Sequence, residues 1–259
     1  MTKGSWTAFP YDAASYTYTS AELKKRWARL HAGDAEPFPK ETAVLQAWVL
    51  FHAGEFQKAV AAGLAAGGGG ICVANKAQAI YANYLEPSET RKLELFLEIA
   101  QRAEGQQAER PKCANAYYWQ AYALGRYAQG ISVAKVLTQD LGSKVRNALE
   151  TTIKLSPRHA DAHIALGAFH AEVIDKVGAL LGKAEGASKE AGLTMFKEAL
   201  RLNPASAIAR IEYAQGLMML RGEQGLEEAE RLYHEAAECE PADAMERLDV
   251  DMARADLEE

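Results

Sequence analysis

The chain has 259 residues, of which 49% are hydrophobic, so it is long and apolar enough to bury a core of its own. Its net charge is −6 and no block of Lys or Arg stands out, which argues against a nucleic-acid partner. The three cysteines are scattered and odd in number, which favours a reducing compartment, so we expect a cytoplasmic protein without a disulfide framework.

Residues 1–19 form an aromatic N-terminal segment with little helical periodicity. Its large rings are Trp6, Phe9, Tyr11, Tyr16 and Tyr18. No apolar run of signal-peptide length follows Lys3, so export is not expected. Since aromatic rings left in water waste apolar area, the segment is expected to pack on the chain's own helices, on the first ones or at a groove around Tyr118 and Tyr122. The alternative is a disordered arm that orders only with a partner or second subunit.

The stretch after this segment predicts a first helix pair and then two looser helices. Residues 46–63 contain Gly54, Glu55 and Phe56, which give the turn and the start of a second helix. Gly67 to Gly70 predict a connector, because a phosphate-binding loop would need a Lys-Ser/Thr ending. Residues 71–105 predict two helices that separate near Pro87. No uncharged stretch is hydrophobic enough to predict stable membrane insertion.

Four prolines mark a repeating unit from residue 111 onward. Pro111, Pro157, Pro204 and Pro241 each follow a helical pattern and are spaced by 46, 47 and 37 residues. Tetratricopeptide repeats have a period of about 34 residues and consist of two helices joined by a turn. The spacing therefore predicts helix-turn-helix repeats at 114–157, 160–204 and 207–241, the first two of them enlarged.

The side chains within these units match the tetratricopeptide pattern of small and large residues. The last unit carries Ala229, Tyr233, Ala236 and Pro241, as expected for its second helix. Gly167 in the middle unit predicts a close helix crossing. Residues 243–259 are acidic and amphipathic, so they are expected to cap the last repeat. We expect one α-solenoid domain over residues 20–259.

Both enlarged units extend the first helix, or the turn after it, with apolar residues. In the first insertion these are Ile131, Val133, Val136 and Leu137, and in the second Val173, Ile174, Val177, Leu180 and Leu181. Because repeats stack on their neighbours, the two insertions are expected to bury these side chains as one added wall.

Residues 115–259 resemble the tetratricopeptide domain of the regulator-of-microtubule-dynamics family and of the T-component proteins associated with TRAP transporters. The resemblance rests on ANAYYWQAYALG, KLSPRHADAHIALGAFH and KEALRLNPASAIARIEYAQGLMML. It implies an all-α solenoid in the form of a right-handed superhelix, whose first helices line a concave groove. It also implies that the long helices of the enlarged units deepen this groove into a cavity.

Carried onto this register, the groove residues of such repeats fall on one face of each first helix. The binding residues expected from this are Tyr118, Tyr122, Arg126, Ile164, Glu172, Ile211, Gln215 and Met218, with Trp48 and Phe51 added from the first unit. Tyr118, Ile164 and Ile211 replace the Lys and Asn with which chaperone-binding repeats clamp a terminal carboxylate. At helical spacing the same residues could equally belong to the core.

An aromatic and aliphatic groove predicts a non-enzymatic scaffold that holds a protein or peptide segment. The alternative is a carrier or sensor of a small apolar or lipid-like ligand, and the oligomeric state is left open. His159, His163 and His170 offer a His-x3-His spacing, but no second pair completes a zinc site. None of the cysteines carries a catalytic signature, so no catalytic residue, metal, cofactor or enzyme activity is predicted.

Overall fold

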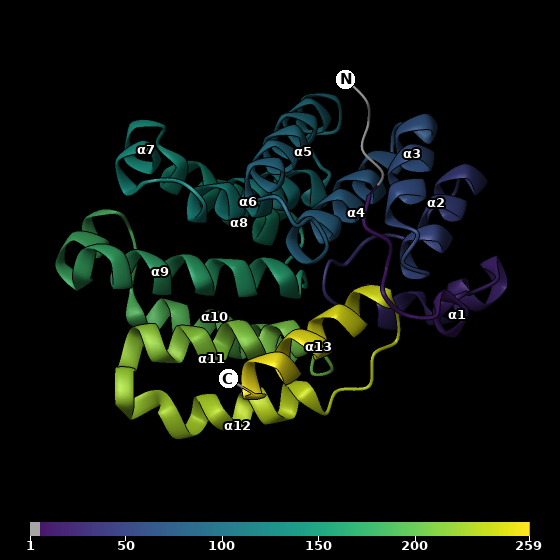
Figure 1. Ribbon diagram of the computed structural model, residues 1–259. Coiled ribbons are helices and arrows are strands. Elements are labelled where there is room, and N and C mark those ends of the chain that lie inside the picture. Colours follow the sequence, from purple (N-terminus) through teal and green to yellow (C-terminus); the bar gives the residue numbers. More distant parts are fainter. Residues whose placement is uncertain (1–5, 259) are drawn as a thin grey trace.

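The computed structural model describes residues 6–258, and within this range the protein is entirely helical, with no strand (Figure 1). The α-helices are α1 (Ser20–Leu30), α2 (Thr42–His52), α3 (Phe56–Ala66), α4 (Gly70–Tyr84), α5 (Glu89–Glu109), α6 (Ala114–Gln129), α7 (Val133–Thr138), α8 (Leu141–Leu155), α9 (Ala160–Ala184), α10 (Lys189–Leu202), α11 (Ala207–Arg221), α12 (Leu226–Ala237) and α13 (Ala244–Glu258). Two short 3-10 helices are η1 (Ala13–Tyr16) and η2 (Gly222–Gly225). The prediction of an all-α fold is confirmed.

The helix ends follow the chemistry of the sequence. α8 and α10 each end two residues before a proline, at Leu155 and Leu202, because the residue before a proline disfavours helical geometry. Ser206 caps the N-terminus of α11, since its side chain accepts a hydrogen bond from the N–H of Ala209. The helices therefore fall within the predicted repeat ranges, whereas the exact division into repeat units stays a prediction.

Consecutive helices pack on one another. The part of the chain that contains the predicted repeats, residues 114–241, is called the repeat half, and apolar contacts hold its helices together. Phe196 of α10 is fully buried and stacks on Tyr213 of α11, with ring centroids 5.3 Å apart. A Cβ atom on Gly167 would lie 2.9 Å from this ring, and one on Gly216 would lie closer still. The two glycines thus let α9 and α11 approach Phe196 from both sides.

The N-terminal half contains buried charges as well as aromatic rings. Lys76 of α4 is 2% exposed, and its Nζ lies 2.6 Å from Oδ2 of Asp34. The other carboxylate oxygen of Asp34 lies 2.8 Å from Nδ1 of His31. Burial acts to raise the pKa of Asp34, but His31 and Lys76 together hold it well below its usual value. The Lys76 ammonium also lies over the rings of Trp48 and Phe51.

The aromatic N-terminal segment packs on the first helices. Trp6 stacks on Tyr81 of α4 at 3.8 Å between ring centroids, and Phe9 covers Gly54 and packs edge-on against Phe56. None of its described residues lines the groove at Tyr118, which was one of the two positions expected from the sequence. Residues 1–5 of the predicted segment and residue 259 of the predicted cap lie outside the described residues.

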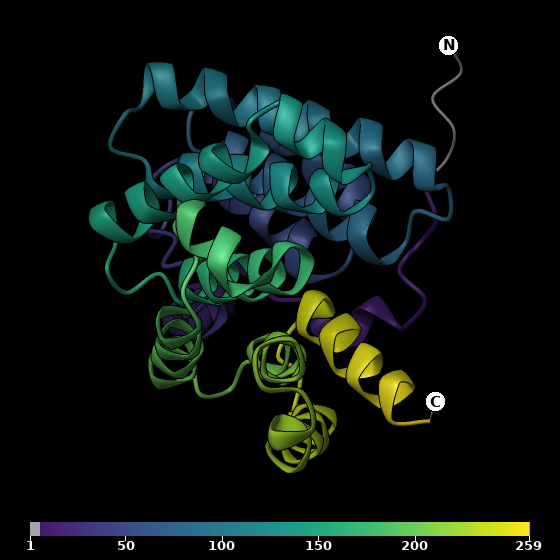
Figure 2. The same ribbon diagram turned by 90° about the vertical axis from the view of Figure 1, so that its left-hand side faces the viewer.

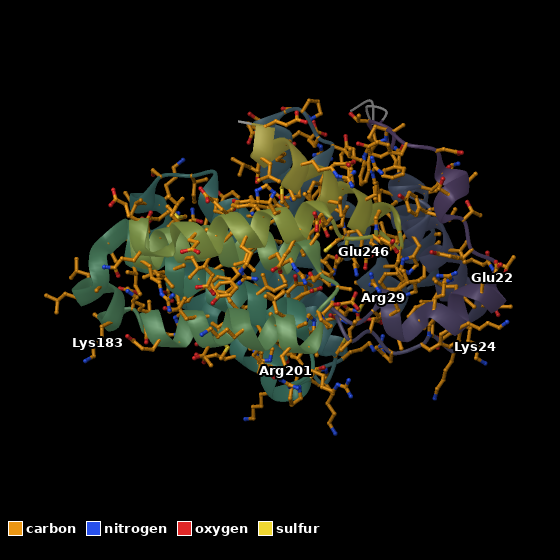
Figure 3. The ribbon with its side chains drawn as sticks, turned by 90° about the horizontal axis from the view of Figure 1, so that it is seen from below. Glu22, Lys24, Arg29, Lys183, Arg201 and Glu246 are labelled. Carbon is orange, nitrogen blue, oxygen red and sulfur yellow. The ribbon has the colours of Figure 1, made fainter. Side chains whose placement is uncertain are left out.

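The last helix connects the two ends of the chain. α13 packs on α11 and α12 as a cap would, but its first turn also reaches α2 (Figures 1 and 2). Arg29 of α1 binds Glu246 through two N–O contacts of 2.5 and 2.9 Å (Figure 3). His52 of α2 lies 2.7 Å from Asp243, and both side chains are buried. The solenoid is therefore closed on itself by contacts between its first and last helices.

Candidate functional site

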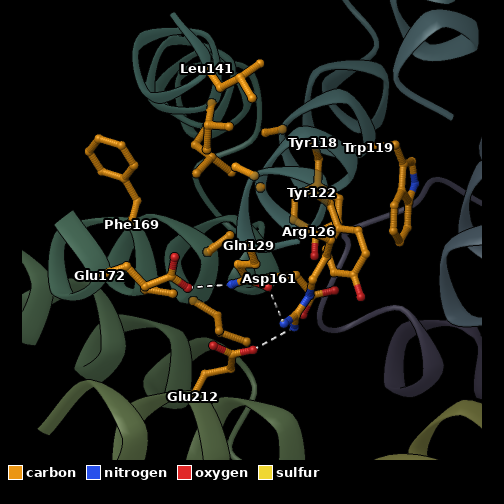
Figure 4. A pocket seen from close by; sticks show the side chains of 18 of the residues that line it. Tyr118, Trp119, Tyr122, Arg126, Gln129, Leu141, Asp161, Phe169, Glu172 and Glu212 are labelled. Atoms are coloured by element: carbon orange, nitrogen blue, oxygen red, sulfur yellow. Dashed lines mark hydrogen bonds and ion pairs between the residues drawn. The ribbon is translucent and has the colours of Figure 1, made fainter. Parts of the chain in front are cut away.

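A cavity of about 340 Å³ lies between the first helices of the repeats. α6 and α9 provide two of its walls, α7 and α8 the third, and α4, α11 and α13 complete its inner end (Figure 4). The apolar part of the lining includes Ile131, Val136, Leu141, Val145, Leu149 and Phe169. Most of the lining is therefore suited to an apolar group.

The inserted segments of the two enlarged units supply one side of the cavity. Ile131 and Val136 from α7 and its approach, and Val173 and Val177 from α9, all line it. The added wall is only partly buried, which differs from the sequence-based expectation. Leu137 is 61% exposed, and beyond a kink at Gly178 Leu180 is 86% exposed. The cavity therefore borders apolar surface that the chain itself leaves uncovered.

A line of polar side chains crosses the cavity from α9 to α11. Glu172 accepts a hydrogen bond of 2.5 Å from Gln129, and Gln129 in turn accepts one of 3.2 Å from Arg126. Arg126 also lies 2.8 Å from Glu212 and 5.4 Å from the centre of the Tyr122 ring (Figure 4). This arrangement holds the guanidinium against α11 and leaves apolar side chains on both flanks.

Acidic groups outnumber basic ones on the cavity wall. The acidic lining residues among those described are Asp140, Asp161, Glu172, Glu185, Glu212, Glu246 and Asp249, and the basic ones are Lys76, Arg126 and Lys176. Burial raises the pKa of Asp161 to about 7 and that of Asp249 to about 8, although Lys76 opposes the first shift and a hydrogen bond from Tyr84 the second. These carboxyl groups are buried, and the cavity wall has fewer basic side chains than acidic ones. A positive group in the cavity would therefore stabilise their charged forms.

Five of the predicted binding residues lie around this cavity. They are Tyr118, Tyr122 and Arg126 on successive turns of α6, and Ile164 and Glu172 on α9. The repeat register of the sequence is thus sufficient to place these side chains on a common face. Their role in binding stays a prediction.

The other five predicted residues lie elsewhere. Trp48 and Phe51 belong to the N-terminal core, where they surround Lys76 and leave no surface for a partner. Ile211 is fully buried against Val250 of α13, because this helix occupies the face of α11 that corresponds to the cavity face of α6 and α9. Gln215 and Met218 follow Ile211 along α11 and do not line the cavity.

The structure adds residues that the sequence reasoning did not select. α11 faces the cavity through Ile208 and Glu212, which lie one turn apart. Their spacing was a visible signal, but the choice between this face and that of Ile211 depends on where α13 packs. Asp249 and Glu246 line the cavity only because α13 packs back toward the first helices. The local sequence of α13 does not predict this position.

Two of the three histidines at α9, His159 and His163, have hydrogen-bond partners within the fold. His159 caps the helix by accepting a hydrogen bond from the N–H of Ala162, and its other ring nitrogen lies 2.7 Å from Asn115. Within residues 6–258, no group of three or more His, Cys, Asp or Glu side chains is placed to hold a metal ion. In the same range no helix is both long and apolar enough to cross a membrane.

Comparison with known proteins agrees with this architecture. The family model described as regulator of microtubule dynamics protein 1-3 matches residues 72–257. The crystal structure of a thermophilic TPR protein of Thermus thermophilus superposes with a TM-score of 0.58 at 17% sequence identity, covering 82% of this chain and 97% of the other. No curated protein matches the chain. The structural likeness establishes a TPR-like solenoid fold, as predicted.

Proposed function

Since this chain belongs to the regulator of microtubule dynamics protein 1-3 family, we propose that it is a non-catalytic scaffold that binds an apolar segment of a partner protein in the cavity between α6 and α9. One observation carries the proposal. The cavity is lined mainly by apolar side chains and opens beside α7, whose Val133 and Leu137 are exposed to solvent. A partner would bury this surface by placing anchor side chains in the cavity.

The chain's own last helix indicates the form of such a segment. α13 is amphipathic and packs Val250 and Ala253 against Ile211 of α11, on the face that corresponds to the cavity face of the neighbouring repeats. The solenoid therefore already accommodates one helix on this surface. We infer that the partner segment is a second amphipathic helix, which would continue the row beyond α13.

The charge of the cavity narrows the partner's chemistry. Asp161 and Asp249 have raised pKa values because burial disfavours their charged forms. A Lys or Arg beside the apolar anchors of the partner would lower both values and gain a charge-assisted hydrogen bond. The proposed segment is therefore apolar with at least one basic residue, and we propose that it is met in the cytoplasm.

Photo-crosslinking in the native host tests this assignment. A benzoylphenylalanine introduced at Gln129, which is exposed and lines the cavity, is expected to capture a partner peptide. The same group at Gln57, an exposed residue of α3 away from the cavity, provides the matched control. Capture of the same peptides from both positions, or of peptides without an amphipathic pattern, would contradict the proposal.

A cavity-filling variant supplies the second half of the test. Ala168→Trp places a large ring at a lining position, so it is expected to abolish capture at Gln129, whereas Ala61→Trp on the exposed face of α3 is expected to leave it unchanged. Circular dichroism of both variants checks that the fold is retained. Undiminished capture by a folded Ala168→Trp protein would show that the cavity is not the binding site.

A small apolar ligand is the second candidate, favoured by the size of the cavity. Its volume of about 340 Å³ lies within the roughly 300–1,000 Å³ typical of small-molecule sites. Native mass spectrometry after gentle purification distinguishes the two candidates. A co-purifying mass that disappears in Ala168→Trp would favour the small ligand, and its absence would favour the protein segment.

A further inference from the structure

Two of the three cysteines meet at the outer end of α4, away from the cavity. Cys72 lies in the first turn of α4 and Cys113 immediately precedes α6, and their Sγ atoms are 3.7 Å apart although the residues are separated by 41 positions. Neither side chain lines the cavity. A disulfide requires an S–S distance of about 2.05 Å, so a shift of about 1.7 Å closes the bond.

The two thiols differ in their surroundings. Cys72 is buried, and Gln106 donates a hydrogen bond of 3.3 Å to its sulfur. Cys113 is partly exposed and sits at the N-terminus of α6. A hydrogen bond from the Cys72 thiol, and then the backbone N–H of Ala116, lower the pKa of Cys113 to about 6, while the pKa of Cys72 is raised well above its usual value. The shared proton therefore stays on Cys72 and the thiolate forms at Cys113.

We propose that Cys113 and Cys72 form a peroxide-reactive thiol pair, in which Cys113 is the attacking nucleophile and Cys72 the resolving thiol. The substrate is a hydroperoxide, because this oxidant needs only a thiolate and a proton source. Cys113 is a partly exposed residue, which provides access, and the sulfur of the buried Cys72 is near enough to trap the first product. This site is independent of the cavity and of its proposed partner.

The reaction proceeds in two balanced steps. The Cys113 sulfur attacks the terminal oxygen of the hydroperoxide, an S–O bond forms as the O–O bond breaks, and the alkoxide or hydroxide takes a proton from solvent. Cys113 is then a sulfenic acid. The Cys72 sulfur attacks the Cys113 sulfur, an S–S bond forms as the S–O bond breaks, and the released hydroxide leaves as water with the proton of Cys72. Two thiols are oxidised by two electrons while one hydroperoxide is reduced.

Cys239 provides an internal comparison. It is partly buried, its thiol donates a hydrogen bond of 3.3 Å to the carbonyl of Glu235, and burial raises its pKa. No second sulfur is paired with it among the described residues. At neutral pH it is therefore expected to react several-fold more slowly than Cys113, since the thiolate is the reacting species.

Limited oxidation followed by mass spectrometry tests the proposal. The full-length protein is treated with one equivalent of hydrogen peroxide, and free thiols are then blocked under denaturing conditions. The expected result is an intact monomer that carries one blocking group, at Cys239, instead of three, and a Cys72-to-Cys113 linked peptide that dithiothreitol removes. Oxidation that begins at Cys239, or that yields only intermolecular disulfides, would overturn the proposal.

Serine variants assign the two roles. Cys113→Ser is expected to abolish both the disulfide and the rapid alkylation by iodoacetamide, whereas Cys72→Ser is expected to leave a sulfenic acid at Cys113 that dimedone traps. Cys239→Ser is the matched control and is expected to behave as the unaltered protein. Melting temperatures confirm that each variant is folded, and Cys72→Ala replaces Cys72→Ser if the buried hydroxyl is not tolerated. Trapping at Cys72 in the Cys113→Ser variant would reverse the assignment.

Discussion

The two halves of the molecule are stabilised in different ways. In the repeat half, α9 to α12 are held by apolar side chains that interlock around Phe196, and the close contacts are made by glycines. In the N-terminal half, the core around Trp48 encloses the ion pair between Lys76 and Asp34. The first arrangement depends on side-chain volume, and the second depends on charge.

This difference explains why the sequence predicts the repeat half better than the N-terminal half. The pattern of small and large side chains recurs with each repeat, so it can be recognised from a single sequence. A buried ion pair joins two residues at an arbitrary separation, here 42 positions, and leaves no periodic trace. The N-terminal half is therefore the region in which a single charge substitution has the greater effect, and each of the following variants tests that contrast.

Removal of the buried ammonium is expected to have the largest effect. Lys76→Met leaves the buried Asp34 with His31 as its remaining side-chain partner, and breaking such a pair typically costs about 3–5 kcal/mol. Urea unfolding followed by circular dichroism measures the loss. Lys58→Met, at an exposed pair with Glu55, is the matched control and is expected to cost less than about 1 kcal/mol.

A double variant separates charge from packing at this position. Asp34→Asn combined with Lys76→Met removes the unpaired charge while it keeps a polar partner for His31, so much of the lost stability is expected to return. If the double variant is as unstable as Lys76→Met alone, the lysine acts through its packing on Trp48 and Phe51, and the contrast between the two halves fails.

Overpacking of the repeat half is expected to have the next largest effect. A Cβ atom on Gly167 would already lie 2.9 Å from the Phe196 ring, so Gly167→Leu forces the helices apart and is expected to cost about 1–3 kcal/mol or more. Gly105→Leu, on α5 with open space around its Cβ position, is the control. Equal melting temperatures for the two variants would show that the crossing of α9 and α10 is not tightly packed.

Deletion of residues 1–19 is expected to have a smaller effect on the N-terminal half. It removes the ring of Trp6, which stacks on Tyr81, and the ring of Phe9, which covers Gly54. Since both rings are only partly buried, we expect the free energy of unfolding to fall by about 1–2 kcal/mol. Differential scanning calorimetry measures the change. Since the described part of this segment does not line the cavity, dye binding there is expected to stay constant, and an unchanged melt would mean that the segment does not stabilise the core.

Substitution of Asp249 is expected to change the pH dependence of stability at the junction of the two halves. Asp249 has a pKa of about 8 in the fold, raised by burial from its ordinary value of 3.8. Between these two pH values the native state binds the carboxyl proton and the unfolded state does not. The protein therefore loses stability through this group as the pH rises from about 4 to 8. Asp249→Asn cannot titrate.

The free energy of unfolding of the variant is therefore expected to rise relative to that of the unaltered protein, by at most about 1.4 kcal/mol per pH unit between pH 6 and 8. Asn keeps an oxygen that can accept the hydrogen bond from Tyr84, which limits other changes. Parallel stability curves for the two proteins over this range would contradict the burial of an uncompensated carboxyl at this site. Asp251→Asn, on the outer face of α13 beside Arg247, is the comparison variant.

The extent to which the sequence predicted the site follows from the same contrast. The prolines at 111 and 157 follow the ends of α5 and α8, and counting forward from each proline gave Tyr118, Ile164 and their neighbours on α6 and α9. The same count failed on α11, where Ile211 is covered by α13. A repeat pattern describes a face that every unit shares, and it cannot describe a helix that returns from the end of the chain to cover one of these faces.

The N-terminal prediction failed for a related reason. Trp48 and Phe51 had the spacing of groove residues, yet the same spacing serves a core, and the lysine that decides between the two readings is 25 residues or more away in sequence. Cys72 and Cys113 are likewise scattered in the sequence and adjacent in the fold. In each case the missing information is a tertiary contact between distant positions.

The closure made by α13 also determines how the chain reaches and leaves its native state. An open solenoid unfolds by fraying from its ends, because each terminal unit has one neighbour. Here Arg29 contacts Glu246 across 217 positions and His52 contacts Asp243 across 191, so neither end can fray without releasing the other. The closing contacts have high contact order and are expected to form late in folding. The last helix thus converts a linear array into a ring that opens as one cooperative unit.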